Sequence, residues 1–248
     1  MHNGAIMPSE VRHLVDRGQN HPLVRLTGVL DADGVATIRS ILLEVLAGQP
    51  EAVVVDVADL RVAGDDPLSA LRDVLEETRD WPAARLALCG VTNGTPWQST
   101  GWQVWPDRAG AFAALGAPDA GRRVSLRLDP VVGAARRARE LITETCLRWG
   151  CAEVAGNACI AATEMVNNVV AHARTSMSVL LARQGGTISV AVRDGSRLPP
   201  RFTGPVAPTS FGGRGLLLID SVAVRWGLLA LPDGKVVWAL LAPEQITV

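Results

Sequence analysis

The stretch Glu164–His172 reads EMVNNVVAH, and its order of polar and apolar residues predicts a helix with two faces. Glu164, Asn168 and His172 recur at intervals of four residues, so a helix would place them along one polar stripe. Met165 and the valines would point to the core. Asparagine is a poor helix former, and two adjacent asparagines in mid-helix are costly without a role. The stripe is therefore either a solvated helix face or part of a binding site.

The spacing of Glu164 and Asn168 suits a nucleotide site, because a carboxylate lies one helical turn before a carboxamide. The amide oxygen of Asn168 can ligate Mg²⁺, a hard cation that prefers oxygen, together with phosphate oxygens. The carboxylate of Glu164 can polarise an incoming hydroxyl group.

A second signal is Asp194, which ends a strand-like run and is followed by Gly195 in VAVRDGS. A carboxylate at this place could accept a hydrogen bond from an exocyclic amine such as that of adenine. Guanine presents a carbonyl at the equivalent position, so the contact would favour adenine. The ordinary alternative is an aspartate that starts a turn.

A third signal is the glycine-rich stretch FGGRGLLLID, residues Phe211–Asp220, which leads into a short helix. Backbone N–H groups at Gly213 and Gly215, free of Cβ obstruction, can cradle phosphates at the positive end of the helix dipole. Arg214 could add a charge-assisted contact. The alternative is a flexible loop with a glycine hinge. The stretch matches neither the P-loop nor the dinucleotide-binding motif.

Strands and helices alternate in both halves of the chain, which predicts the α/β class. A turn-rich stretch separates the halves, so we predict domains at 9–116 and 124–243 with a linker at 117–123. In the first domain, Asp31 can cap a helix that begins at Ala32. The other expected helices there are 67–79 and 106–115, and the expected strands are 23–30, 52–57 and 85–91.

In the second domain, the aspartate and proline of Asp129–Pro130 predict the start of a helix that ends at Gly150. A longer helix should follow at 152–173, and Gly185–Gly186 should turn a hairpin. The remaining expected elements are a helix at 215–222 and strands at 124–128, 177–183, 187–193, 224–231 and 235–241.

The composition is that of an ordinary globular protein, with 48% apolar and 20% charged residues. The net charge of −1 argues against direct nucleic-acid binding or an anionic-membrane surface, since either needs a basic footprint. No apolar stretch approaches the roughly 20 residues that span a bilayer, and no export signal is recognisable, so we expect a cytoplasmic protein. The four cysteines show no metal-binding spacing and are expected to be buried free thiols.

The three signals, in this order and followed by GKVVWALL, resemble the GHKL ATPase fold, and in particular the anti-sigma-factor serine kinases. In that family the helix motif reads close to ELVTNAVRHA and the later box close to GRGLxLVxxLADRWG. Here the box stands as GRGLLLIDSVAVRWG, residues 213–227. The resemblance covers about Val124–Ala242 and implies an ATP-binding (Bergerat) α/β sandwich under a mobile lid.

The resemblance also implies roles for individual residues. Glu164 would be the catalytic base, Asn168 the Mg²⁺ ligand and Asp194 the adenine contact. The wider superfamily often has DxGxG at this place, whereas here Ser196 and Leu198 stand at the two later glycine positions, which looks similar to the subfamily with DxSPLPP-like text. The further ATP-binding positions implied are His172 and Gly195, and, at the phosphate end of the lid, Gly213, Arg214 and Gly215.

The first half resembles the STAS domain, the fold of anti-anti-sigma factors. VVVDVADLRVAGDDPLSAL, residues 53–71, is similar to the family pattern VVLDLSGVTFIDSSGLRAL. Asp65 and Asp66 stand where that pattern has the serines, one of which receives phosphate, so the position is a degenerate phosphoacceptor site. One interpretation is drift in an acidic loop that caps a helix. The other is that Asp65 imitates, in part, a phosphorylated serine.

Two functions follow from these resemblances. The first is an ATP-binding anti-sigma factor of a bacterial partner-switching pathway, with serine-protein-kinase activity toward a separate STAS protein and an effect on transcription. The alternative is a non-enzymatic, ATP-dependent switch that sequesters a sigma factor or a STAS partner. The family also suggests a homodimer.

Overall fold

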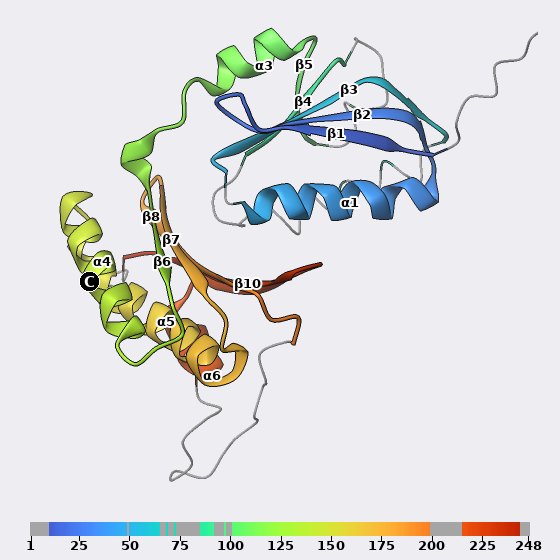
Figure 1. Cartoon of the computed structure of the whole chain (residues 1–248). Coiled ribbons are helices and arrows are strands. Elements are labelled where there is room, and N and C mark those ends of the chain that lie inside the picture. Colours follow the sequence, from blue (N-terminus) through green and yellow to red (C-terminus); the bar gives the residue numbers. More distant parts are fainter. Residues whose placement is uncertain are drawn as a thin grey trace, which may run out of the picture. The chain divides into compact units, whose positions relative to one another are not determined.

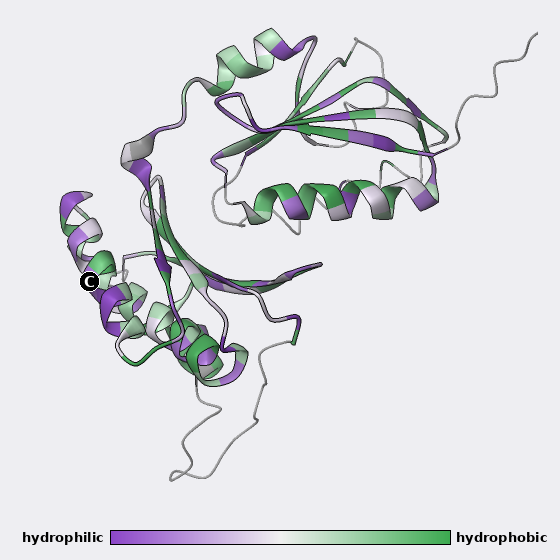
Figure 2. Cartoon of the chain, viewed as in Figure 1, coloured by the Kyte–Doolittle hydropathy of each residue, from purple (hydrophilic) through white to green (hydrophobic). Residues whose placement is uncertain are grey.

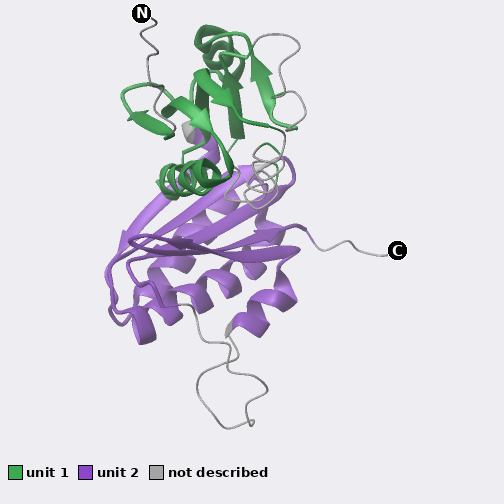
Figure 3. Cartoon of the chain, turned by 90° about the vertical axis from the view of Figure 1, so that its right-hand side faces the viewer, with its two compact units in different colours: residues 1–119 green, residues 120–248 purple. Residues whose placement is uncertain are grey.

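The computed structural model describes residues 10–48, 50–64, 68, 72, 85–91, 97, 101–198 and 215–243. By its internal contacts the chain divides into two compact units, Met1–Asp119 and Ala120–Val248 (Figure 3). The described residues of each unit form one five-stranded sheet with helices packed on it. The Asp65 and Asp66 position, most of the predicted helix 67–79, and Gly213 and Arg214 lie outside the described residues.

The sheet of the first unit has the strand order β1-β2-β3-β4-β5. β1 runs antiparallel to β2, and the other neighbours are parallel. Helices α1 and α3 lie on opposite faces of this sheet (Figure 1). The strands are β1 (Arg12–Asp16), β2 (Leu23–Leu30), β3 (Ala52–Val62), β4 (Arg85–Cys89) and β5 (Gln103–Trp105), and the helices are α1 (Ala32–Ala47) and α3 (Arg108–Leu115).

Local signals predicted the two described helices of this unit, α1 and α3, to within two residues. Asp31 caps α1 by accepting a hydrogen bond from the backbone N–H of Gly34 at 2.9 Å, as predicted. The helix predicted at 106–115 begins at Arg108, because the side chain of Asp107 caps it by accepting from Gly110 N–H at 2.7 Å. β1 and β5 were not predicted, since both are short and lie at the edges of the sheet, where little of the strand is buried.

The sheet of the second unit has the order β6-β7-β8-β10-β9, and every neighbouring pair is antiparallel. Helices α4, α5 and α6 cover one face of it (Figure 1). The strands are β6 (Arg123–Leu128), β7 (Met177–Gln184), β8 (Thr187–Asp194), β9 (Arg225–Leu231) and β10 (Gly234–Leu241). The helices are η2 (Ala120–Arg122), α4 (Ala134–Arg148), η3 (Ala152–Val154), α5 (Ala155–Asn168), η4 (Val169–Ala173) and α6 (Gly215–Val222).

Apolar side chains from the helices and the sheet form the core of the second unit. Ile142 of α4 and Met165 of α5 are almost completely buried, and so are Leu181 and Ile188 on the strands. Burying each such side chain stabilises the fold by about 1.5–3 kcal/mol. Figure 2 shows the two-faced character of α4, in which hydrophobic and hydrophilic residues alternate along the turns of the helix. This packing holds α5 at a set distance from the sheet.

The prediction that a helix starts at Asp129–Pro130 was wrong. α4 begins at Ala134, with Gly133 as its N-cap at φ 96° and no capping side chain. A turn precedes it, in which the N–H of Val131 donates to the carbonyl of Asp129 at 2.8 Å. The N–H of Val131, one of the groups that the Asp129 side chain would have capped, thus has its partner within the turn.

The predicted helix 152–173 also differs from the structure, because three elements replace it. A short 3₁₀ turn, η3, comes first, and α5 then runs as a regular helix to Asn168. The last turn, η4, is π-helical. The hairpins and α6 match their predicted ranges to within one residue.

The cysteines are free thiols, and Cys89, Cys146 and Cys151 are buried, whereas Cys159 is partly exposed. Burial raises the pKa of Cys146 to about 12, so its thiol stays protonated near neutral pH. Such a thiol is a small apolar core residue and not a nucleophile.

Gly234 has no room for a side chain, because a Cβ at this residue would lie 2.0 Å from the carbonyl oxygen of Asp194. Gly234→Ala should therefore lower the free energy of unfolding by about 1–3 kcal/mol or more, since the backbone of β8 would have to shift. Urea unfolding followed by tryptophan fluorescence measures the change. The matched control is Gly186→Ala in the β7–β8 turn, where a Cβ meets no atom within 4 Å. Equal losses for the two variants would contradict the steric argument.

Candidate functional site

The end of α5 departs from regular helical geometry. Residues Val169–Ala173 form the π-helical turn η4, and the N–H of Arg174 donates to the carbonyl of Val169 at 2.7 Å. Arg174 adopts the left-handed conformation at φ 55°. Such turns are rare, cost stability relative to a regular helix and are found frequently at functional sites. The irregular turn therefore makes the surface beside η4 a candidate for the functional site.

A pocket lies beside η4 and is shared by the end of α5, by β8 with the loop after it, and by β10. Most of its wall is apolar, and a small number of polar side chains project from different elements, which is typical of small-molecule sites. The lining residues are Met165, Asn168, Val169, His172, Ala173, Val192, Asp194, Ser196, Leu198, Lys235 and Val237.

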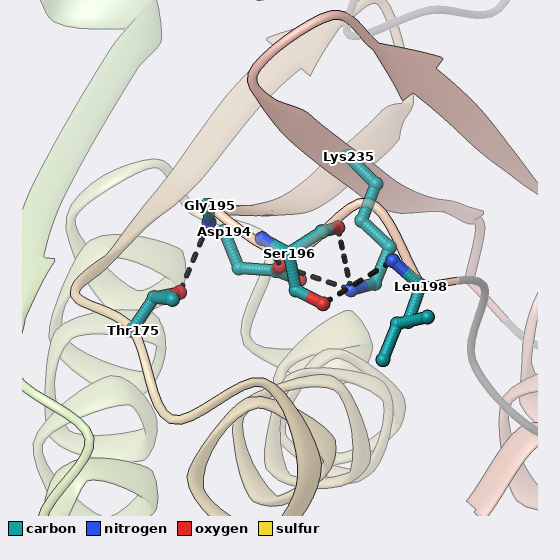
Figure 4. Close-up of polar contacts among 6 residues, drawn as sticks. All are labelled: Thr175, Asp194, Gly195, Ser196, Leu198 and Lys235. Carbon is teal, nitrogen blue, oxygen red and sulfur yellow. Dashed lines mark hydrogen bonds and ion pairs between the residues drawn. The ribbon is translucent and has the colours of Figure 1, made fainter.

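Two of the lining residues, Asp194 and Lys235, form a buried ion pair (Figure 4). The ammonium of Lys235 donates to Oδ1 of Asp194 at 2.9 Å, and the two side chains are only 9% and 1% exposed. Lys235 also donates to the carbonyl of Ser196 at 3.1 Å, and the N–H of Ser196 donates to Asp194 Oδ1 at 2.7 Å. Burying charges this deeply is costly unless they are paired and hydrogen-bonded, and here they are.

Backbone register explains how these two residues meet. β8 and β10 are antiparallel neighbours, and Asp194 stands directly opposite Lys235 in the ladder. The turn after β8 is held by Thr175, whose hydroxyl oxygen accepts from the N–H of Gly195 at 3.0 Å (Figure 4). The carboxylate of Asp194 is thus held in place by its strand, its turn and its partner.

The structure brings Asn168, His172 and Asp194 together around the pocket. Glu164 lies one turn earlier on α5, is half-buried and does not line the pocket. Burial raises the pKa of the Glu164 carboxyl above its ordinary value. Gly195 lies immediately beyond Asp194, and Gly215 is the first residue of α6.

Lys235 is the pocket residue that sequence reasoning missed. It is the only lysine in the chain and belongs to GKVVWALL in the closing hairpin, but no role in the site was assigned to it from the sequence. Its contact with Asp194 spans 41 residues of sequence. Only the strand order of the sheet brings the two together. Thr175, which holds the turn after β8 and does not line the pocket, was also not predicted. Leu198 was named only as the replacement of a family glycine, without a place in the pocket lining.

Comparison with known families identifies the second unit. The family model described as the histidine kinase-like ATPase domain matches residues 129–239. Residues 129–239 are a histidine kinase-like ATPase domain. The pocket lies within the ATPase domain, and membership implies that this domain binds ATP.

Two solved structures are similar in fold to the N-terminal part of the chain. One is an anti-sigma factor antagonist from Mycobacterium paratuberculosis, at 20% identity and a TM-score of 0.36, which covers 43% of this chain and 95% of that one. The other is the anti-sigma factor antagonist SpoIIAA in its unphosphorylated form, at 15% identity and a TM-score of 0.33, with coverages of 42% and 94%. No curated protein matches the chain. Among the described helices, none has the length and apolar character needed to cross a membrane.

The raised pKa of Glu164 predicts how stability depends on pH. The folded chain holds the proton more tightly than the unfolded chain, so the free energy of unfolding falls as pH rises from the unfolded pKa through the folded one. Glutamine has no charge to desolvate. Glu164→Gln should therefore be more stable than the wild type at neutral pH. The difference should shrink as pH falls through the folded pKa and be absent below about pH 4, where the carboxyl is protonated in both states. Urea unfolding at a series of pH values measures it.

Glu140→Gln is the control for this experiment. Glu140 lies exposed on α4 and pairs with Arg136 at 3.6 Å, one helical turn away. Surface pairs of this kind contribute about 0.5 kcal/mol or less, so the control should change stability little at any pH. Equal stability of wild type and Glu164→Gln at neutral pH would show that the carboxylate is not desolvated by folding.

Proposed function

We propose that the ATPase domain binds Mg²⁺–ATP in this pocket and transfers the γ-phosphoryl group to a serine of a separate STAS protein. The chain would thus be an anti-sigma factor with protein-kinase activity in a bacterial partner-switching pathway. The observation that carries the proposal is the convergence of Asn168 and Asp194 on one pocket of an ATPase domain.

The polar groups of the pocket fit the parts of the nucleotide. The Asp194 carboxylate is an acceptor at a buried end of the site, which suits the 6-amino group of adenine. Asn168 offers a carboxamide oxygen, a ligand type that Mg²⁺ takes together with phosphate oxygens. His172 and Gly195 stand close to these positions, and the phosphate-binding role of Gly213, Arg214 and Gly215 remains part of the proposal.

The chemistry would rest on positioning and electrostatics, as is usual for phosphoryl transfer. Bound Mg²⁺ would supply positive charge against the developing charge on the phosphates. Glu164 would accept the proton of the serine hydroxyl, whose oxygen attacks the γ-phosphorus while the bond to ADP breaks. Its raised pKa makes Glu164 a stronger base than an exposed glutamate. Because Glu164 and Asn168 share one helix, base and metal ligand keep a constant spacing.

A second candidate function is a non-enzymatic switch that sequesters a sigma factor or a STAS partner when ATP is bound. The observation that favours it is the position of Glu164, which is half-buried and outside the pocket lining. The two candidates share the ATP site and differ in whether phosphate leaves it. Both would act in the cytoplasm, with domains at 9–116 and 124–243, and a homodimer is part of either proposal.

Incubation of the full chain with γ-labelled ATP, Mg²⁺ and candidate STAS proteins separates the two functions. Label on a serine of the STAS protein supports the kinase. ATP-dependent binding of a sigma factor or STAS protein without labelling supports the switch. Absence of ATP binding contradicts both.

Asn168 provides the test of the metal site. Asn168→Ala removes the only carboxamide that lines the described pocket, so the gain in ATP affinity on adding Mg²⁺ should disappear while the affinity without Mg²⁺ stays close to wild type. Isothermal titration calorimetry with and without Mg²⁺ measures both quantities. The control is Asn167→Ala, an exposed residue adjacent on α5, which should keep the Mg²⁺ effect. A Mg²⁺ effect that survives in Asn168→Ala would assign the ligand elsewhere.

Glu164 provides the test of catalysis. Glu164→Gln keeps the size of the side chain and removes the base, so phosphoryl transfer to a cognate STAS serine should fall by about 10²–10⁴-fold with little change in ATP affinity. Single-turnover labelling measures the rate, and Glu140→Gln on α4 should react like the wild type. Transfer at the wild-type rate by the Gln variant would mean that Glu164 is only a polar-face residue.

A further inference from the structure

Lys235 is a buried cation that the proposed chemistry does not use. Its side chain is 9% exposed, lines the pocket and ends at the carboxylate of Asp194. A long, flexible ammonium side chain is costly to bury and order, and replacing a buried ion pair by apolar residues is often neutral or stabilising. The stability of the fold therefore does not by itself explain why this pair is buried here.

The hydrogen bonds of the pair leave binding capacity on both partners. Lys235 Nζ carries three N–H groups, of which two are directed to Asp194 Oδ1 and to the carbonyl of Ser196. Asp194 Oδ1 accepts from Lys235 and from the N–H of Ser196. Within the described residues, neither the third ammonium hydrogen nor Asp194 Oδ2 has a hydrogen-bond partner. A donor and an acceptor thus belong to two paired, buried residues of the pocket lining.

Adenine carries the complementary pair of groups on one edge. Its 6-amino group is a donor, and the neighbouring ring nitrogen N1 is an acceptor. Guanine reverses both, with a carbonyl oxygen at position 6 and an N–H at position 1. A carboxylate alone can recognise only the amino group, whereas a carboxylate beside an ammonium can recognise both positions.

We propose that Lys235 is a specificity-determining residue that donates to N1 of adenine while Asp194 accepts from the 6-amino group. The inference rests on the proposed ATP site and not on phosphoryl transfer. The ion pair holds both side chains in place before the nucleotide arrives. Nucleotide binding therefore costs little side-chain conformational entropy at these two residues. Guanine in the same pose places a carbonyl against the carboxylate and an N–H against the ammonium, so it is rejected at two positions.

The decisive comparison uses ATP and its 1-deaza analogue, in which C–H replaces N1 and the 6-amino group is kept. Calorimetry on the full wild-type chain should show the analogue binding roughly 10- to 100-fold more weakly, since a hydrogen bond from a charged donor is lost in a buried site. The same comparison on Lys235→Met, which keeps the length of the side chain without the ammonium, should show weaker ATP binding and no difference between the two ligands.

Arg193→Met is the matched control. Arg193 precedes Asp194 on β8, pairs with Asp233 at 2.8 Å and does not line the pocket. The Arg193→Met variant loses one positive charge near the pocket, as Lys235→Met does. Any fall in its ATP affinity therefore measures the non-specific attraction between local positive charge and the triphosphate. This variant should discriminate between the two ligands as the wild type does.

Each result decides the inference. Equal affinity of the wild type for ATP and the analogue overturns it, and so does an equal loss for the analogue in wild type and Lys235→Met. If circular dichroism shows that Lys235→Met is unfolded, the wild-type comparison and the Arg193→Met control decide alone. Absence of ATP binding by the wild type contradicts the proposed function itself, whereas ATP binding without discrimination contradicts only the role of Lys235.

Discussion

The register between β8 and β10 is the constraint on which the pocket depends. It places Asp194 opposite Lys235, and the resulting ion pair lies at the buried end of the site. Register and ion pair support each other. A slip of one residue would turn each side chain to the opposite face of the sheet, and an unpaired charge buried at this depth would cost several kcal/mol. Gly234 belongs to the same constraint, because only a residue without a Cβ lets β10 approach Asp194.

The helical layer supplies the other wall of the pocket, and its position follows from apolar packing. Met165 and Val166 anchor α5 in the core against the strands, so Asn168, just before the π turn, is held at the pocket. The π turn then ends the helix beside the site, and the chain continues through Thr175 to β7. A rigid sheet and a packed helix therefore meet at the place where the backbone is least regular, an arrangement that suits ligand binding.

Much of the architecture is readable from local sequence. The Asp31 cap, the Gly185–Gly186 turn and the ranges of β7 and β8 to within one residue were predicted correctly, because caps and turns depend on neighbouring residues. The start of α4 was not, since the aspartate and proline at 129–130 resemble a helix start, whereas the N–H of Val131 donates to the carbonyl of Asp129 in a turn and the helix begins only after Gly133. The edge strands β1 and β5 were missed because short, exposed strands carry little pattern.

In the candidate site, too, local features could be predicted from the sequence and contacts between distant segments could not. The sequence by itself determined that Glu164, Asn168 and His172 share a helical stripe and that Asp194 ends a strand, because both follow from periodicity and local turn chemistry. Only the tertiary structure decided that Asn168 and Asp194 meet at one pocket while Glu164 stands outside its lining. It also decided that Lys235, 41 residues from Asp194 in the chain, neutralises that carboxylate. The reason is physical: strand order and burial are set by the packing of distant segments, and no local pattern encodes them.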